Sequence, residues 1–166
     1  MKKILSLTLA VLTLNGFAGT GDVSSSIPAP SPCVTGLVSD GTGLWSVDRK
    51  TDQICRIDPA DGKIMGTLKS PGYFPTGLAW DGAGLWVSDI DFVSTSSEIY
   101  SGKIYRVDPA SGNTSHAIMT PGNSPQGLAW DGECLWVSDN EDDMLYRVSP
   151  EDGTIIHSFR APAGDP

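Results

Sequence analysis

The residues most able to do chemistry are aspartates that close three copies of one motif. The motif reads GLVSDGTGLWSVD at residues 36–48, GLAWDGAGLWVSD at 77–89 and GLAWDGECLWVSD at 127–139. Further acidic residues follow each copy. The candidate ligand-binding residues are therefore Asp48, Asp89, Asp91, Asp139, Asp142 and Asp143. Carboxylates of this kind suit a basic ligand or a hard cation such as calcium.

Two interpretations of these aspartates remain open from the sequence. The acidic segments are "DRKTD" (48–52), "DIDFVSTSSE" (89–98) and "DNEDD" (139–143). None has the spacing of an EF-hand or of an RTX calcium repeat, so the sequence predicts no specific metal site. Calcium is the cation that acidic loops of this kind would suit. The competing interpretation is a set of solvated loops in which each motif's last aspartate caps a turn.

Other reactive residues do not form a catalytic arrangement. The two histidines, His116 and His157, occupy one repeat position, and no Ser/His/Asp or Cys/His order stands out. Cys33, Cys55 and Cys134 fall at three different repeat positions and include no CxxC pair, which argues against a repeated disulfide or a zinc site. Cys55 is interpreted as a packing residue, and Cys134, beside a turn, as an exposed thiol. The sequence therefore predicts no catalytic residue and no cofactor.

The elements that position these residues are short β-strands. Beyond the motif, "QICRIDPADG" (53–62), "KIYRVDPASG" (103–112) and "MLYRVSPEDG" (144–153) are also equivalent. Segments such as "LWVSD" and "IYRVD" alternate apolar and polar residues, as strands do, and Asp-Gly pairs mark hairpin turns between them. Each repeat of about 40 residues therefore contains four strands, which we call A to D in chain order.

The repeated aromatic and acidic residues also have structural explanations. Trp45, Trp86 and Trp136 share one position in strand B, and Trp80 and Trp130 end strand A, so we expect these side chains to pack between repeats. Asp40, Asp81 and Asp131 precede glycine in the A–B turn, while Asp58 and Asp108 open the C–D turn. Local hydrogen bonds to backbone amides explain aspartate at such positions.

The pattern PxGLAWDGxxLWVSD…IYRVDPxxG resembles the blades of secreted bacterial β-propellers of the NHL, YVTN, streptogramin-lyase and plant-type glutaminyl-cyclase kinds. The resemblance covers residues 33–164. It implies an all-β fold with three four-stranded antiparallel blades of a six- or seven-bladed propeller. It also implies that the B–C loops and the D–A connections share a rim that commonly carries binding sites. Strand D would be outermost, so the histidines would lie far from a central channel, which disfavours a lyase of this kind.

The predicted domain organisation follows the repeats. Residues 1–18 have the basic start, apolar run and small residues of a signal peptide, which predicts a secreted or periplasmic protein. A linker (19–32) precedes blade 1 (33–73), blade 2 (74–123, with an insertion at about 90–102) and blade 3 (124–164). Residues 165–166 would start a fourth blade. No later segment is long and apolar enough to span a membrane, and the net charge of −9 disfavours nucleic acid as a partner.

Two functions fit these observations. The first is a non-catalytic binding or scaffold module that contacts a protein or small-molecule ligand through the acidic B–C loops. The second is the N-terminal part of a propeller enzyme, a lyase or a glutaminyl-cyclase-like protein, with its catalytic residues in further blades. Three blades would leave apolar faces open, so the sequence also predicts either a fragment of a larger ring or self-association through the open blade faces.

Overall fold

The computed structural model describes residues 21–94 and 99–162, and this part of the chain is all β. Alternation of apolar and polar residues and the Asp-Gly turns divide it into short strands. In chain order the strands are β1 (Val34–Ser39), β2 (Leu44–Asp48), β3 (Gln53–Ile57), β4 (Ile64–Lys69), β5 (Pro75–Trp80), β6 (Leu85–Ser94), β7 (Ile99–Val107), β8 (Thr114–Met119), β9 (Pro125–Trp130), β10 (Leu135–Asp139), β11 (Met144–Val148) and β12 (Ile155–Arg160).

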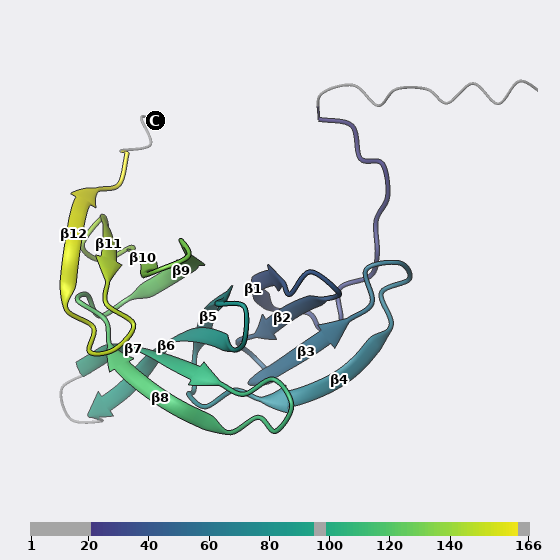
Figure 1. Ribbon diagram of the computed structural model, residues 1–166, viewed down its shortest axis with the longest axis horizontal. Coiled ribbons are helices and arrows are strands. Elements are labelled where there is room, and N and C mark those ends of the chain that lie inside the picture. The colour runs from purple at the N-terminus through teal and green to yellow at the C-terminus, as the bar shows by residue number, and fades with distance from the viewer. Residues whose placement is uncertain (1–20, 95–98, 163–166) are drawn as a thin grey trace, which may run out of the picture.

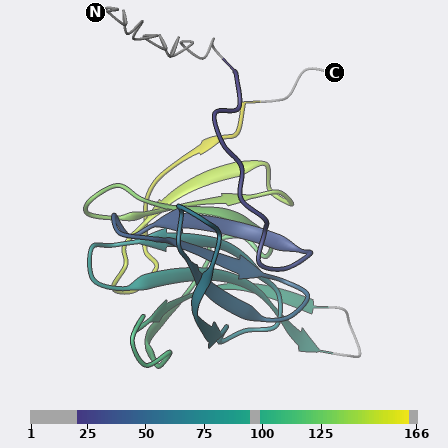
Figure 2. The same cartoon turned by 90° about the vertical axis from the view of Figure 1, so that its right-hand side faces the viewer.

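The strands form three four-stranded antiparallel sheets, each in sequence order: β1 to β4, β5 to β8 and β9 to β12. We call them blades 1, 2 and 3. They stand side by side in an arc whose inner strands are β1, β5 and β9, and both ends of the described chain lie on its open side (Figure 1). The side view shows the three sheets layered against one another (Figure 2). The predicted all-β propeller-like fold with three four-stranded blades is confirmed.

The core lies between the blades rather than within them. One cluster joins Trp45, Val47 and Ile54 of blade 1 to Leu78 and Leu85 of blade 2. The next cluster repeats the arrangement between blades 2 and 3, around Trp86. The packing role predicted for the tryptophans is confirmed at these two junctions, where Trp45 and Trp86 are only 4% and 3% exposed. Each sheet therefore buries both faces only where it has a neighbour on both sides.

A glycine in each of the inner strands β1 and β5 lets the next blade approach closely. A Cβ atom on Gly36 would lie 2.8 Å from the amide nitrogen of Leu78, and one on Gly77 would lie 2.7 Å from the carbonyl oxygen of Gln126. Both distances are too short for a side chain, and the obstructing atoms belong to the backbone of the next blade. The glycine of the repeated GL pair is therefore explained by blade-to-blade packing.

A polar triad of aspartate, tryptophan and arginine ties the A–B turn of every blade to strands B and C. In blade 2, one carboxylate oxygen of Asp81 accepts hydrogen bonds from the amides of Ala83 and Gly84 in the A–B turn. The other accepts from Trp86 Nε1 at 2.9 Å and from Arg106 Nε at 2.7 Å. Blades 1 and 3 repeat the triad with Asp40–Trp45–Arg56 and Asp131–Trp136–Arg147. The turn role predicted for the aspartates is confirmed, whereas the arginine of strand C is a partner that sequence analysis missed.

The C–D turns also follow their prediction. Asp58 Oδ1 accepts from the amide of Ala60, and Asp108 Oδ1 accepts from the amides of Ala110 and Ser111. Gly112 then adopts a φ of 75°, the left-handed conformation that glycine allows. These local bonds fix the direction in which strand D returns along the outer edge of each blade.

Blade 2 differs from its neighbours in the hairpin between strands B and C. β6 and β7 continue past the ends of their counterparts, with Asp89 paired to Lys103 and Asp91 to Ser101. Asp89 and Asp91, which the sequence placed in a loop, therefore lie within a strand. The predicted signal peptide (1–18) and the start of a fourth blade (165–166) fall outside the described residues. In the described ranges, no helix has the length and apolarity needed to cross a membrane.

Candidate functional site

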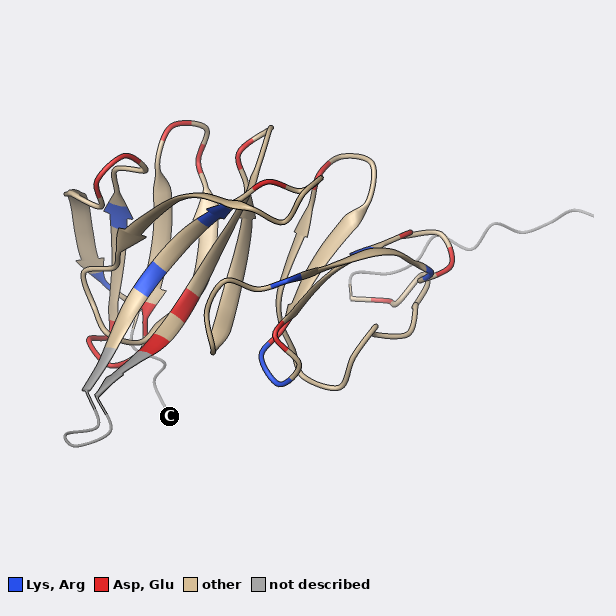
Figure 3. Ribbon diagram, turned by 90° about the horizontal axis from the view of Figure 1, so that it is seen from below, with Lys and Arg blue, Asp and Glu red and all other residues tan. Residues whose placement is uncertain are grey.

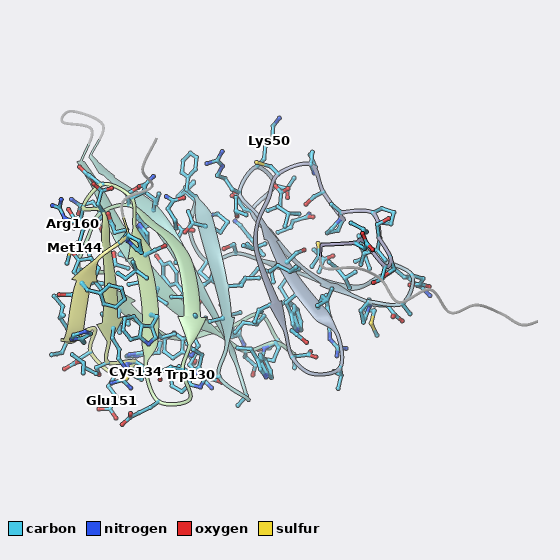
Figure 4. The ribbon with its side chains drawn as sticks, turned by 90° about the horizontal axis from the view of Figure 1, so that it is seen from above. Lys50, Trp130, Cys134, Met144, Glu151 and Arg160 are labelled. Carbon is cyan, nitrogen blue, oxygen red and sulfur yellow. The ribbon has the colours of Figure 1, made fainter. Side chains whose placement is uncertain are left out.

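The candidate residues belong to one of two opposite rims of the arc. Side chains of the B–C hairpins and strand-D ends, such as Lys50, Met144 and Arg160, lie towards one rim, whereas Trp130, Cys134 and Glu151 lie towards the other, where the A–B and C–D turns are (Figure 4). We call the first the B–C rim. The connections that lead into β5 and β9 reach the same rim, since their backbones bond Asp89 and Asp139.

Asp48 and Asp139 use their carboxylates to hold the B–C rim together. One oxygen of Asp48 accepts from the amides of Lys50 and Thr51 in the B–C turn, and the other accepts from the amide of Cys33 at 2.6 Å. Asp139 has the same arrangement in blade 3. Its oxygens accept from the amides of Glu141 and Asp142, and from that of Ser124.

This geometry makes the two aspartates structural ties. Both are almost fully buried, at 1% and 3% exposure, and each links the turn after strand B to the segment before strand A. Burial alone would raise the pKa of Asp48, but the hydrogen bonds from Cys33, Thr51 and Lys50 outweigh it and lower the pKa well below its ordinary value. The structure thus gives both carboxylates the turn-capping contacts of the competing interpretation.

Asp89 occupies the same position, but only one of its two carboxylate oxygens has hydrogen-bond partners. Its Oδ1 accepts from the amides of Tyr73 and Phe74, at 3.1 and 3.2 Å. The extended hairpin places no turn amides near its other oxygen, and Oδ2 is buried without a hydrogen-bond partner. Burial, reinforced by the negative charge of Asp91, raises the pKa of Asp89 to about 6 despite the two amide bonds. This carboxyl group therefore titrates near pH 6.

Asp91 forms a small charged cluster beside Asp89. Its Oδ2 accepts from Lys103 Nζ at 2.7 Å and from the Tyr105 hydroxyl at 2.9 Å. Burial opposes ionisation of Asp91, but these bonds outweigh it and lower its pKa. Burial and the bond to Asp91 raise the pKa of Tyr105, so the phenol stays protonated. Asp91 is thus satisfied within its own hairpin.

The last two predicted residues lie in the exposed turn of blade 3. Asp142 accepts a hydrogen bond from the Tyr146 hydroxyl at 2.9 Å. Asp143 adopts a left-handed φ of 55°, as Asp52 does at the same place in blade 1, and its carbonyl accepts from the amide of Ala161. Together with Glu141, these side chains make the turn of blade 3 acidic and open to solvent.

A hollow on the B–C rim involves residues that sequence analysis did not single out. It has a volume of about 740 Å³ and is lined by Cys33, Arg49, Lys50, Asp52, Tyr73 and Phe74. Arg49 and Lys50 are exposed, while Asp48 beside them is buried. The exposed charged side chains of the blade 1 loop are therefore basic, beside the half-buried Asp52, and Figure 3 marks basic residues along the ribbon in blue. The sequence signals from which this site could have been found are the two adjacent aromatic residues, Tyr73 and Phe74, and the two adjacent cations, Arg49 and Lys50.

The histidines have structural contacts on the outer strands. His116 lies in β8 and His157 in β12, each at the outer edge of its sheet, as predicted. His116 Nε2 is 2.7 Å from the carbonyl oxygen of Glu151 in blade 3, and its ring meets Trp86 edge-on. His157 meets Trp136 in the same way. Both rings therefore contribute to packing at the outer edge of the blades.

The prediction that Cys134 is an exposed thiol is wrong. Cys134 is only 4% exposed, and its amide donates to Asp131. Burial raises the pKa of its thiol. Cys55 is buried in strand C, in agreement with the packing role predicted for it. Across the residues that the structure describes, no group of three or more His, Cys, Asp or Glu side chains is arranged to hold a metal ion.

Comparisons with known proteins establish the fold alone. No protein-family model matches the sequence, and no curated protein matches it. Among solved structures, the chain is similar to Myxococcus xanthus glutaminyl cyclase, with a TM-score of 0.64 and 16% identity over 77% of this chain and 53% of that one. It thus spans about half the length of that protein. It is also similar to the computationally designed Ika4 protein, with a TM-score of 0.56 and 10% identity over 85% of this chain and 82% of that one.

Proposed function

We propose that this chain is part of a non-catalytic, propeller-type binding or scaffold module whose ligand contacts the B–C rim. The observation that carries the proposal is the hollow lined by Arg49, Lys50, Tyr73 and Phe74. Tyr73 and Phe74 are 74% and 47% exposed, although their backbone amides are fixed by the buried Asp89. Exposed aromatic side chains on a fixed backbone are typical of residues that carry binding energy.

The chemistry of the hollow favours a ligand with an anionic group and an apolar part. Arg49 and Lys50 supply two positive charges against the one negative charge of Asp52, and the two aromatic side chains supply apolar surface. The chain as a whole carries a net charge of −9, which repels anions. Binding of an anionic ligand would therefore depend on these two local cations, which makes the proposal testable by substitution.

The test uses two labelled peptides of opposite charge. Fluorescence anisotropy would compare a fluorescein-labelled peptide Glu-Glu-Phe-Glu-Glu with Lys-Lys-Phe-Lys-Lys. We expect the acidic peptide to bind, and the double variant Arg49→Ala/Lys50→Ala to weaken its binding about tenfold, or about 1.4 kcal/mol. The matched control is Lys63→Ala/Lys69→Ala, which removes two exposed lysines of blade 1 outside the hollow. Binding that the first variant leaves unchanged would contradict the proposed site.

The acidic turn of blade 3 supports a second ligand class at the same rim. Glu141, Asp142 and Asp143 are exposed there, and such side chains suit a basic peptide or calcium. Calorimetric titration with calcium chloride and anisotropy of the lysine peptide test this part of the proposal. Both signals should fall in Glu141→Gln/Asp143→Asn, and a signal that persists would place the ligand elsewhere.

We also propose that the module acts outside the cytoplasm. The support is the basic, apolar and small-residue pattern of residues 1–18. Mass spectrometry of the exported chain should show an N-terminus at Gly19. An intact Met1 in the cell envelope would contradict export by cleavage.

A second candidate function is suggested by the similarity to a glutaminyl cyclase. In this alternative the chain is the N-terminal part of a propeller enzyme whose catalytic residues lie in further blades. The assay is ammonia release from a peptide that begins with glutamine, with the chain alone and with any additional blades encoded next to it. Activity of the longer protein, and none of the chain alone, would favour this alternative over the binding module.

A further inference from the structure

The two junctions between blades are built from the same parts. On the face that each blade turns to the next one, a strand-A glycine touches the neighbouring backbone, a strand-B tryptophan is buried, and a strand-D apolar residue lies on the next C–D turn. At the first junction these residues are Gly36, Trp45 and Leu68, and at the second they are Gly77, Trp86 and Ile118. We call this set the forward face of a blade.

The strand-D contact is the most specific part of the junction. A Cβ on Gly112, in the C–D turn of blade 2, would lie 3.4 Å from a methyl carbon of Leu68. A Cβ on Gly153, in the turn of blade 3, would lie 3.5 Å from Ile118 Cβ. The outer strand of each blade thus reaches across to a turn of the next blade, and His116 adds its contact to Glu151 at the second junction.

Blade 3 carries a complete forward face, and no described residue of another blade covers it. Apart from Ser138 of its own blade at 3.0 Å, a Cβ on Gly127 would meet no atom within 4 Å. Trp136 is half-buried, and Phe159, the counterpart of Leu68 and Ile118, is 43% exposed. A shallow apolar hollow of about 260 Å³ lies beside them, lined in part by Ala129 and Leu145.

The opposite face of blade 1 carries the matching half. Leu37, the counterpart of the buried Leu78, is 61% exposed on its inner strand. At the outer edge, the segment Ile27–Pro30 lies against the blade and lines a hollow of about 210 Å³ with Leu37 and Leu44. Ile27 and Pro28 sit 3.2 and 3.3 Å from the Cβ position of Gly62, the place that a strand-D residue takes at both junctions. The segment thus stands in for the outer strand of a preceding blade.

We propose that the forward face of blade 3 docks blade 1 of a second copy of this chain, and that two copies close into one ring. Three arguments select this occupant. The same chain carries both halves of a junction it already makes twice. The three blades form an open arc (Figure 1), so in the described part of the chain the forward face of blade 3 and the opposite face of blade 1 have no neighbouring blade. Phe159 fits where Ile27 now lies, so the segment Ile27–Pro30 competes with docking.

The decisive substitution is Gly127→Ala. In a single copy the added methyl group meets only the Ser138 hydroxyl, so folding should be little affected. In a docked pair it would meet the backbone of the second copy, as a Cβ on Gly77 would meet Gln126 and Leu128 at 2.7 and 2.9 Å. The matched control is Gly66→Ala, because a Cβ on Gly66 in the exposed strand β4 meets nothing within 4 Å.

Light scattering would give the mass of the full chain and of a chain that begins at Gly19, over a range of concentrations. We expect twice the chain mass for wild type and Gly66→Ala, and the single mass for Gly127→Ala. The urea midpoint of Gly127→Ala should equal that of wild type at concentrations too low for pairing, because pairing itself stabilises the folded chain. Ile27→Ser should strengthen pairing, because it weakens the competing segment. Three outcomes would overturn the proposal: a wild-type chain that stays single, a pair that survives Gly127→Ala, or a mass that keeps rising with concentration beyond that of two copies. A chain that stays single would leave a blade of another chain as the occupant of the forward face.

Discussion

Replacing Asp89 with asparagine is expected to stabilise the chain at neutral pH, although the residue is buried and hydrogen-bonded. Asp89 is fully buried and its Oδ2 has no partner. Asparagine keeps an oxygen that accepts from the amides of Tyr73 and Phe74, and it places an NH₂ donor where the unpaired oxygen was, next to the Asp91 carboxylate. The substitution thus removes a buried negative charge and keeps the oxygen that accepts the two amide hydrogen bonds.

The size of the effect follows from the shifted pKa of Asp89. The folded value is about 6 and the ordinary value is 3.8, so the folded chain holds an extra proton between these pH values. Wild-type stability therefore falls as pH rises through this window, by about 3 kcal/mol when the shift is converted at 1.36 kcal/mol per pKa unit. Asp89→Asn does not titrate and avoids this loss. Its stability relative to wild type should rise by the same amount between about pH 4 and pH 7.

Urea unfolding followed by tryptophan fluorescence measures the difference at each pH, with Asp139→Asn as the matched control. Both oxygens of Asp139 accept backbone amides, so asparagine there would leave an amide donor facing an NH₂ group. We expect that control to lose about 1–3 kcal/mol at neutral pH. The reasoning is refuted if Asp89→Asn also destabilises the chain at pH 7, or if its effect is the same at both ends of the window.

Two further predictions concern packing. Gly77→Ala should lower the free energy of unfolding by about 1–3 kcal/mol or more, because its methyl group would meet the backbone of β9 at 2.7 Å. Urea unfolding measures this loss. The urea midpoint of the control Gly66→Ala, whose methyl group meets nothing within 4 Å, should not change. Cys134 should react with iodoacetamide more slowly than Cys33, because it is buried and the pKa of its thiol is raised. Peptide mass spectrometry of the native chain measures the two rates. Equal rates would contradict the burial of Cys134.

The sequence predicts the blades well because their information is local and repeated. The alternation in "LWVSD", the Asp-Gly turns and the tryptophans each report a strand, a turn or a buried face, and the structure agrees at β2, β6 and β10. The arginine of the triad was missed because Arg56, Arg106 and Arg147 lie a strand away from the aspartates they bind. A cross-strand partner has no fixed sequence spacing, so repetition alone does not reveal it.

The rim could not be predicted with the same success, because exposure there depends on how loops fold back. "DRKTD" and "DNEDD" look alike as acidic segments, yet the first aspartate of each turns inward to accept backbone amides. What remains outside is basic in blade 1 and acidic in blade 3. Cys134 shows the same limit, since a position beside a turn does not say whether the side chain is exposed or buried.

The insertion in blade 2 shows how a change in loop length alters the chemistry of an unchanged residue. In blades 1 and 3 the tight B–C turn brings two amides to the aspartate, and its charge is satisfied. Extending β6 and β7 carries those amides away while the segment before β5 still covers the carboxyl group. The same aspartate then becomes a buried acid that titrates near neutral pH. Because the amides it still holds belong to Tyr73 and Phe74, its ionisation is coupled to the two aromatic residues of the rim hollow, and binding at that hollow should depend on pH over the window in which Asp89 titrates.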